Sequence, residues 1–203
     1  MDPEQTRSKI LGAADTLFGE LGFDVTTTRD IAERSGVNKA LIHYHFGTKD
    51  ELLEALLEGY YTGLGKELEA ALGRRQGLAA QVEDLLDAYA DYLAEHRSFT
   101  RIVQREVASG RHMERIVERT LPLFQLGVSW LELGLKRAPK DFDAIQLLTT
   151  VYGMVVTWFT YGEVLARLTG KDPFSPAALA SRKRHVHKVV ALLLCEVQPR
   201  DSK

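Results

Sequence analysis

The side chains whose types and spacing could do chemistry lie close together between residues 26 and 49. The range 34–49 contains three basic residues and no acidic one, although the whole chain of 203 residues has a formal net charge of −2. Hydroxyl, amide and ring N–H groups stand between these cations. Such groups donate hydrogen bonds to the phosphates and base edges of nucleic acid. A local patch can attract a polyanion even when the whole chain does not, so we expect nucleic acid to bind here.

No catalytic or metal-binding pattern competes with this interpretation. None of the six histidines follows a glutamate at a spacing of three residues, as in di-iron helical bundles, and no two histidines are four residues apart. The segment Gly63–Lys66 has two glycines before a lysine, but it follows no strand signal and lacks the Ser or Thr of a phosphate-binding loop. We therefore expect no enzymatic activity, no metal ion and no cofactor.

Helices must position the donor groups, because apolar residues recur at three- to four-residue spacing in the ranges 10–21, 52–68 and 82–93. No segment alternates with the period of two that a half-buried strand needs. We predict an all-α fold, with an N-terminal three-helix helix-turn-helix domain over residues 1–47 and a C-terminal helical bundle of about six helices over residues 48–203.

Turn and cap residues set the predicted helix ends. Gly22 ends the first helix, Thr26 or Thr27 caps the second, and Thr48–Glu51 is a capping box that starts a helix reaching about Leu72. Later breaks are expected at residues 73–77, 109–110, 138–139 and 170–176, and Pro122 indicates a kink or a helix boundary.

Residues 26–46 have the spacing of a helix-turn-helix. Two short helices flank a turn that contains Gly36, which can adopt the left-handed conformation of a tight turn. In this arrangement the second helix enters the DNA major groove, and its N-terminal residues reach the base edges. A helical hairpin that contacts only protein has the same spacing, so both interpretations stay open on spacing alone.

The side chains expected to contact DNA are hydroxyl, amide, basic and aromatic groups and one small residue: Thr26, Thr27, Arg29, Asn38, Lys39, Ala40, His43, Tyr44, His45 and Lys49. Lys49 stands beside the start of the next helix, where backbone N–H groups and the helix dipole also favour a phosphate.

The segment TTTRDIAERSGVNKALIHYHFGTKDELLEAL resembles the DNA-binding domain of the tetracycline-repressor-like (TetR) family. The matching features are the capping Thr, Ile31-Ala32, Gly36-Val37, Tyr44-His45-Phe46, Lys49 and Leu52. The resemblance implies a repressor-type regulator that binds a palindromic double-stranded DNA operator as a dimer. It also implies release of the operator when a small molecule binds the C-terminal domain.

His43 departs from the pattern of that family, which usually has a tyrosine that touches a phosphate at this position. A histidine can donate there, and more strongly when it is protonated. We therefore hypothesise that operator affinity rises as the pH falls from about 7.5 to 6.

Two apolar segments offer a surface for a homodimer. Residues 144–168 are apolar on nearly every side, and a helix of that kind must be covered all round. The last predicted helix, over residues 176–197, ends in a second apolar run. Two copies of both segments could form a four-helix interface, which the resemblance also implies. Burial of both helices inside a monomer is the alternative.

Aromatic and soft side chains in the C-terminal part predict a pocket for a small, mostly apolar effector. The expected lining residues are Tyr89, Phe99, His112, Phe124, Trp130, Tyr152, Met154, Trp158 and Phe159. Polar contacts are expected from His96, Gln104, Arg105, His112 and Gln125. Ordinary core packing is the alternative for each residue. A helical binding or enzymatic bundle without DNA contact is the competing class of function, and an activator would differ from a repressor in operator position.

The remaining composition indicates a cytoplasmic protein without a membrane partner. The single cysteine, Cys195, allows no internal disulfide and fits a reducing compartment, and we expect it to be a small core residue. The N-terminus lacks the apolar run of a secretory signal, and the apolar stretch 147–159 is shorter than the ~20 residues that span a bilayer. The basic run 182–188 is expected to form a solvated helix face.

Overall fold

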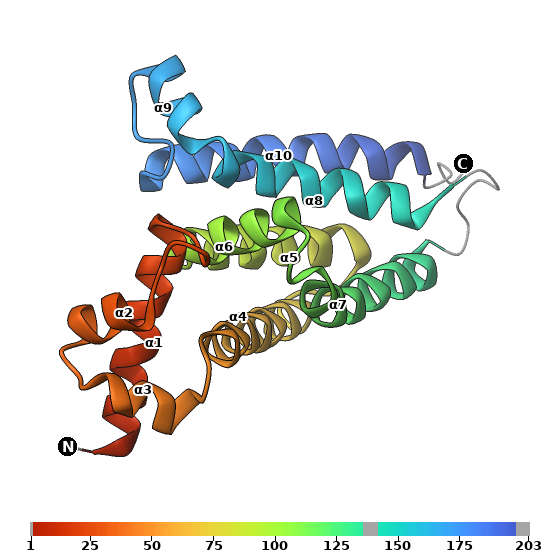
Figure 1. The fold of residues 1–203 in the computed structure, drawn as a ribbon. Coiled ribbons are helices and arrows are strands. Elements are labelled where there is room, and N and C mark those ends of the chain that lie inside the picture. Colours follow the sequence, from red (N-terminus) through yellow and green to blue (C-terminus); the bar gives the residue numbers. More distant parts are fainter. Residues whose placement is uncertain (1, 136–141, 198–203) are drawn as a thin grey trace, which may run out of the picture. The chain divides into compact units, whose positions relative to one another are not determined.

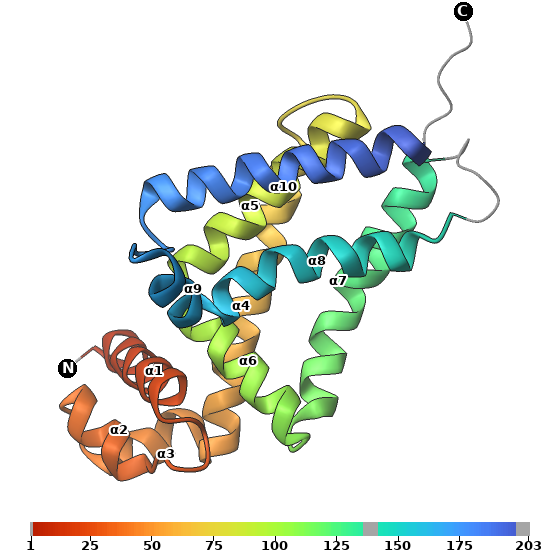
Figure 2. The same cartoon turned by 90° about the horizontal axis from the view of Figure 1, so that it is seen from above.

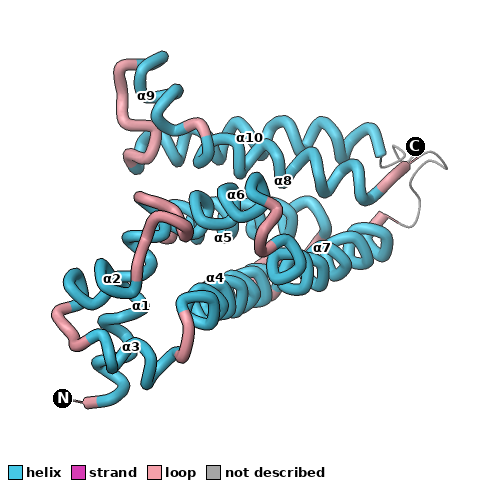
Figure 3. The backbone as a smooth tube through the Cα atoms, viewed as in Figure 1, coloured by secondary structure: helices cyan, strands magenta, loops and turns pink. Residues whose placement is uncertain are grey.

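Helices account for every secondary-structure element in the computed structural model, which describes residues 2–135 and 142–197 (Figure 1, Figure 3). The first three are α1 (Pro3–Glu20), α2 (Thr28–Ser35) and α3 (Lys39–Phe46). The others are α4 (Lys49–Leu72), α5 (Leu78–Glu95), α6 (Arg97–Ser109), α7 (Met113–Gly134), α8 (Ala144–Thr160), α9 (Gly162–Thr169) and α10 (Pro176–Val197). The all-α prediction is confirmed. Within the described residues, six long helices follow α3 as expected, and the short α9 is an addition.

The chain packs into two compact units, each built from separate stretches of sequence. The first contains the described residues up to Gly63 together with His96–Arg119. The second contains Leu64–Glu95 and the described residues from Thr120 onward. Thr48 lies inside the first unit. The division into packed units therefore does not coincide with the domain boundary expected near Thr48. That boundary stays a prediction of where the DNA-binding domain ends.

One apolar core holds the helices of the first unit together. Its most deeply buried large side chains are Ile10, Phe18, Ile31, Ile42, Leu52, Leu53, Leu57, and Ile102. Burial of each large aliphatic side chain contributes about 1.5–3 kcal/mol. Isolated helices as short as the eight-residue α2 and α3 are unstable in water, so packing against α1 and against each other is what stabilises them.

A cation from α6 binds the carbonyl end of α1. Arg105 donates from Nη1 to Phe18 O (3.4 Å) and from Nη2 to Glu20 O (3.1 Å). A positive charge at the carboxyl end of a helix is favourable, because the helix dipole is negative there. The expectation that Arg105 contacts an effector is therefore wrong, since its guanidinium is used to hold the end of α1.

The second unit is built on contacts that α5 makes with α8 and α10. Figure 1 and Figure 2 both show α10 running alongside α8, and the short α9 follows α8 directly. The buried side chains of the second unit include Val82, Leu86, Val155, Val156, Val186, Val190 and Leu194. No described helix combines the length and the hydropathy that a membrane crossing requires.

Most predicted helix breaks are confirmed, namely those at residues 73–77, 109–110 and 170–176, whereas residues 138–139 lie outside the described part of the chain. Arg75 fixes the first of these turns by pairing with Asp84 (2.8 Å) and Glu83 (3.2 Å), and its hydrogen bonds lower the pKa of Asp84. Pro122 does not mark a boundary, because α7 continues through it.

The segment 144–168 forms two helices instead of the single one expected. The chain leaves helical geometry at Tyr161 (φ −99°, ψ 21°), between α8 and α9. Gly162 is buried against the ring of Phe174, and a β-carbon at this position would overlap that ring. Phe174 also stacks on Phe159, with ring centroids 5.8 Å apart. The break depends on this contact with the loop before α10, and helical periodicity gives no sign of it.

Replacing Gly162 by alanine should lower the free energy of unfolding by about 1–3 kcal/mol, because the added methyl group must displace the packed ring of Phe174. The matched control is Gly59→Ala in the middle of α4, where a β-carbon meets nothing within 4 Å. That control should raise stability by about 0.5–1 kcal/mol. Urea unfolding of both variants measures the difference, and equal effects would contradict the account of the break.

Candidate DNA-binding surface and ligand pocket

Local capping fixes the two short helices of the helix-turn-helix. Thr27 and Asp30 form a capping box at the start of α2, where Asp30 N donates to Thr27 Oγ1 (3.2 Å) and Thr27 N donates to Asp30 Oδ2 (2.7 Å). Gly36 ends this helix in the left-handed conformation (φ 67°). Asn38 caps α3 by accepting a hydrogen bond from Ala40 N (2.9 Å). The predicted cap at Thr27 and the predicted turn at Gly36 are confirmed.

The capping carboxylates make the helix starts sensitive to acid. Hydrogen bonds from Thr27 lower the pKa of Asp30, and hydrogen bonds from Thr48 lower the pKa of Glu51. The second pair is the capping box predicted at the start of α4, and Glu51 N donates to Thr48 Oγ1 (3.1 Å). Each folded-state pKa lies below the unfolded value. Their stabilisation is therefore present above the unfolded pKa and is lost as the pH falls through the folded pKa.

One face of α3 is exposed. Ile42 and Phe46 are buried, which orients the helix, and the opposite side chains reach solvent. The exposed residues at and after the cap are Asn38, Lys39, Ala40, His43 and Tyr44, and the side chain of Tyr44 is 79% exposed. His45 is half-buried and meets the Tyr44 ring edge-on, with centroids 5.1 Å apart. Five of the ten residues predicted to contact DNA thus lie on one accessible surface of α3.

On α2, Thr27 and Arg29 are exposed but already hydrogen-bonded. The Thr27 hydroxyl donates to Asp30 Oδ2 (2.7 Å), and Arg29 Nε pairs with Glu33 Oε1 (3.0 Å). Exposed ion pairs of this kind contribute at most about 1 kcal/mol. A phosphate can therefore replace Glu33 as the partner of Arg29 at little cost.

Thr26 cannot contact DNA with its side chain, contrary to the prediction. The residue is completely buried, and its hydroxyl donates to Gly22 O (2.8 Å). A threonine hydroxyl readily bonds a backbone carbonyl four residues earlier. Of the two neighbouring threonines, Thr27 caps the helix and Thr26 closes the loop beneath it.

Lys49 also differs from the prediction, because its ammonium group points into the protein. Nζ donates to Phe23 O (2.8 Å) and to Thr26 O (2.9 Å), and it lies 4.1 Å from the centroid of the Phe23 ring. This geometry makes Lys49 a clamp between the first turn of α4 and the loop that leads into α2. The expected phosphate contact of Lys49 would require the clamp to open.

His43 reaches the end of its own helix. Nδ1 lies 2.8 Å from Gly47 O, and the ring is exposed. A neutral ring that donates to this carbonyl has only a lone pair at Nε2, whereas a protonated ring has a second N–H there. The second N–H is the group that can donate to a phosphate.

The hypothesis from the sequence, that operator affinity rises as the pH falls from about 7.5 to 6, depends on this second N–H of His43 reaching a phosphate. His43→Gln should remove most of this pH dependence, since glutamine does not titrate. Fluorescence anisotropy of a labelled operator at several pH values measures both proteins. Equal pH dependence in the two proteins would remove His43 from this role.

His112 is a buried bridge in the first unit and does not line the pocket, contrary to the prediction. Its Nδ1 contacts Glu106 Oε2, and its Nε2 lies 3.1 Å from Asp50 Oδ1. His112 and Glu106 are 6% and 5% exposed, and Phe23 meets the imidazole ring edge-on. Both ring nitrogens face carboxylates, so neither is available to an effector.

Replacing His112 by alanine should lower the free energy of unfolding by about 3 kcal/mol, because it leaves the carboxylate of Glu106 buried without its partner. Glu118→Ala, at an exposed position of α7, is the control and should stay within about 0.5 kcal/mol of the parent. Chemical unfolding compares the two. A His112 variant as stable as the control would show that the bridge contributes nothing.

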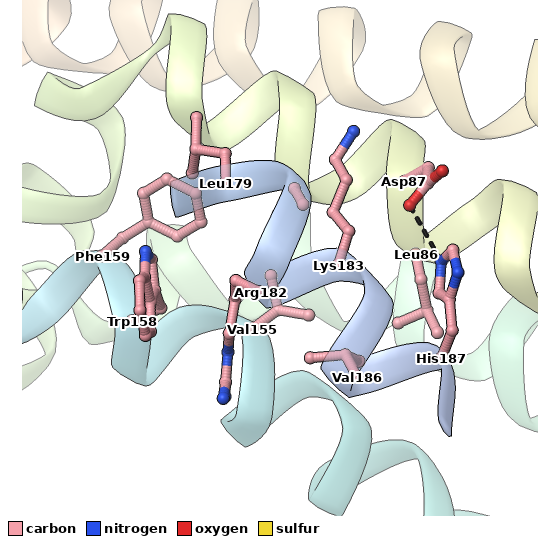
Figure 4. Close-up of a pocket in the computed structure, with 11 residues that line it drawn as sticks. Leu86, Asp87, Val155, Trp158, Phe159, Leu179, Arg182, Lys183, Val186 and His187 are labelled. Atoms are coloured by element: carbon pink, nitrogen blue, oxygen red, sulfur yellow. Dashed lines mark ion pairs between the residues drawn. The ribbon is translucent and has the colours of Figure 1, made fainter. Parts of the chain in front are cut away.

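The second unit contains a pocket between α5, α8 and α10, which encloses about 330 Å³ of space partly open to solvent (Figure 4). The lining residues are Leu86, Asp87, Ala90, Val155, Trp158, Phe159, Leu179, Arg182, Lys183, Val186 and His187. Trp158 and Phe159 are thus the two predicted pocket residues that line it. The residues from α10 were not predicted, although Leu179, Arg182 and Val186 have the spacing of one helix face.

The other predicted pocket residues lie elsewhere. Phe124 and Tyr89 both pack on Tyr152, whose pKa burial raises, and these rings form a separate aromatic cluster. Phe99 belongs to the first unit and stacks on Tyr60. Met154 contributes its carbonyl oxygen to Arg182, and neither Met154 nor Trp130 lines this pocket. None of the expected polar contacts, His96, Gln104, Arg105, His112 and Gln125, lines it either.

Two further expectations about α10 are wrong. Cys195 is exposed, because it lies one position away from the buried Leu194. The basic run is not wholly a solvated face: Lys183 pairs with Asp91, and Arg182 donates to Met154 O (2.6 Å). Among the described residues, no group of three or more His, Cys, Asp or Glu side chains is arranged to hold a metal ion.

Comparison with known proteins identifies both parts of the chain. Residues 10–56 match the family model of bacterial regulatory proteins of the tetR family, and residues 79–190 match the tetracyclin repressor-like C-terminal domain. The transcriptional repressor Rv3405c of Mycobacterium tuberculosis (strain ATCC 25618 / H37Rv) is 29% identical over 169 residues, which cover 83% of this chain and 80% of that protein. The probable transcriptional regulator YttP of Bacillus subtilis (strain 168) is 40% identical over 105 residues, half of each chain.

Solved structures share the fold. The ketosteroid transcriptional regulator KstR2 of Mycobacterium tuberculosis has a TM-score of 0.72 at 20% identity, covering 96% of this chain and 95% of that one. The fatty acid degradation regulator FadR of Bacillus halodurans has a TM-score of 0.75 at 17% identity, covering 91% and 94%. Both family matches and the named relatives concern transcriptional regulators and not enzymes, and the chain belongs to the TetR family of DNA-binding transcriptional regulators.

Proposed function

We propose that this regulator is a repressor that binds a palindromic DNA operator as a homodimer and releases it when a small, mostly apolar effector binds. The observation that carries the proposal is the exposed face of α3, where Asn38, Lys39, His43 and Tyr44 stand on a helix held by a capped turn. A recognition helix in the major groove contacts bases with residues at its N-terminus, and those are the residues exposed here.

The proposed dimer reads two half-sites. One short helix spans only a few base pairs, and a two-fold pair reads half-sites ~34–36 Å apart along the DNA. Large apolar side chains on the helices assigned to the interface remain exposed in the single chain: Ile145 on α8 and Leu192 on α10 are 59% and 69% exposed. We assign these exposed apolar side chains to contacts with a second copy of the chain.

The proposed effector site is the pocket between α5, α8 and α10, whose lining is largely aliphatic and aromatic. The names of the structural relatives, a ketosteroid regulator and a fatty acid degradation regulator, agree with an apolar ligand class. An effector releases DNA only if it binds the non-binding conformation more tightly than the DNA-bound one. We also propose that the protein acts in the cytoplasm.

In vitro selection of random duplexes with the full-length protein tests the proposal. The proposal is supported if the parent protein enriches a palindrome and the Tyr44→Ala variant does not. Weak, salt-sensitive binding without an enriched sequence would contradict it, and the N-terminal helices would then serve a protein partner. An activator would bind the same operator but at a different position relative to the promoter.

Lys39→Gln should weaken binding to the selected operator and reduce the slope of log affinity against log salt by about 1, because one phosphate contact is lost. The control is Lys188→Gln on α10, which removes an exposed lysine of the second unit. Titrations at four salt concentrations give both slopes. If the two variants have the same slope, Lys39 does not contact a phosphate.

A further inference from the structure

Arg182 carries a charge that the protein does not neutralise. Its guanidinium lines the pocket between α5, α8 and α10, and no described carboxylate lies within ion-pair distance of it. The other basic side chains of the pocket have acidic partners, since Lys183 pairs with Asp91 and His187 Nε2 lies 2.9 Å from Asp87 Oδ1 (Figure 4). Arg182 is therefore the exception among the charged residues that line the pocket.

The donors of Arg182 are only partly used. Nη2 donates to Met154 O (2.6 Å), whereas Nε is buried and has no hydrogen-bond partner. The guanidinium lies beside the Trp158 ring (Figure 4), and its Cζ is 5.2 Å from the ring centroid. An aromatic face stabilises a cation but does not neutralise its charge. Desolvation by partial burial lowers the pKa of Arg182.

Charge compensation restricts what can fill the pocket. A neutral apolar ligand would displace water from the guanidinium and supply nothing in its place, which is costly for a partly buried charge. A carboxylate supplies both a countercharge and acceptors for a planar guanidinium. The apolar remainder of such a ligand fits Trp158, Phe159 and Leu179, which line the same pocket.

We propose that the pocket binds a small apolar carboxylate, with the acid group on Arg182 and the hydrocarbon part against Trp158, Phe159 and Leu179. That this ligand acts as the effector rests on the proposed function.

Direct binding to the unaltered full-length protein tests the ligand class. Calorimetry compares two acids with their matched alcohols, octanoate with octanol and benzoate with benzyl alcohol. At least one acid should bind about tenfold or more tightly than its alcohol, because a hydrogen bond to a charged group is the difference between them. If neither acid binds more tightly than its alcohol, the proposal is overturned.

Variants of α10 locate the acid group. Arg182→Gln should abolish the preference for the acid, and Arg182→Lys should restore part of it because it keeps the positive charge. The matched control is Arg184→Gln, which removes an exposed arginine two positions away and should leave the preference unchanged. An acid preference that survives in Arg182→Gln overturns the assignment. These measurements need no operator, so a failed duplex selection counts against the proposed function alone.

Discussion

A short loop joins the end of α1 to the start of α2. The carbonyl oxygens in this loop and in the last turn of α1 need hydrogen-bond donors that the local backbone does not supply. Side chains from distant parts of the sequence provide them. Lys49 binds the carbonyls of Phe23 and Thr26, and Arg105 binds those of Phe18 and Glu20. Because α2 and α3 are too short to be stable alone, the position of the α3 face that we propose to contact DNA depends on this loop being held.

Local signals were enough to predict the helix-turn-helix and most helix ends. The capping Thr27 and the left-handed Gly36 act within their own turn, so residue types predicted a cap at Thr26 or Thr27 and a turn at Gly36. The roles of long basic side chains cannot be predicted in this way. Lys49 and Arg182 can donate hydrogen bonds to a phosphate or to a backbone carbonyl, and here both donate to carbonyls. Their partners are distant in the sequence and are determined by the tertiary fold. The break at Tyr161 was missed for the same reason, since it depends on Phe174.

The two units use buried charge in opposite ways. In the first unit, His112 is enclosed by the carboxylates of Glu106 and Asp50, and the bridge is complete within the chain. In the second unit, Arg182 lines a pocket in which the carboxylate of Asp87 pairs with His187, and Arg182 itself has no ion-pair partner among the described residues. A compensated buried charge stabilises one arrangement of the chain, whereas an uncompensated one favours a ligand of opposite charge. That contrast separates structural ionisable groups from those assigned to ligand binding.

Hydrogen exchange of the Lys49→Met variant tests most directly whether this clamp positions the DNA-binding surface. The account predicts faster exchange at the amides of residues 21–27 and of α2. It also predicts weaker operator binding with an unchanged dependence on salt, because no phosphate contact is lost. The opposite result would contradict it: unchanged exchange in the loop, with the slope of log affinity against log salt reduced by about 1, would make Lys49 a phosphate contact and leave the loop held by other groups.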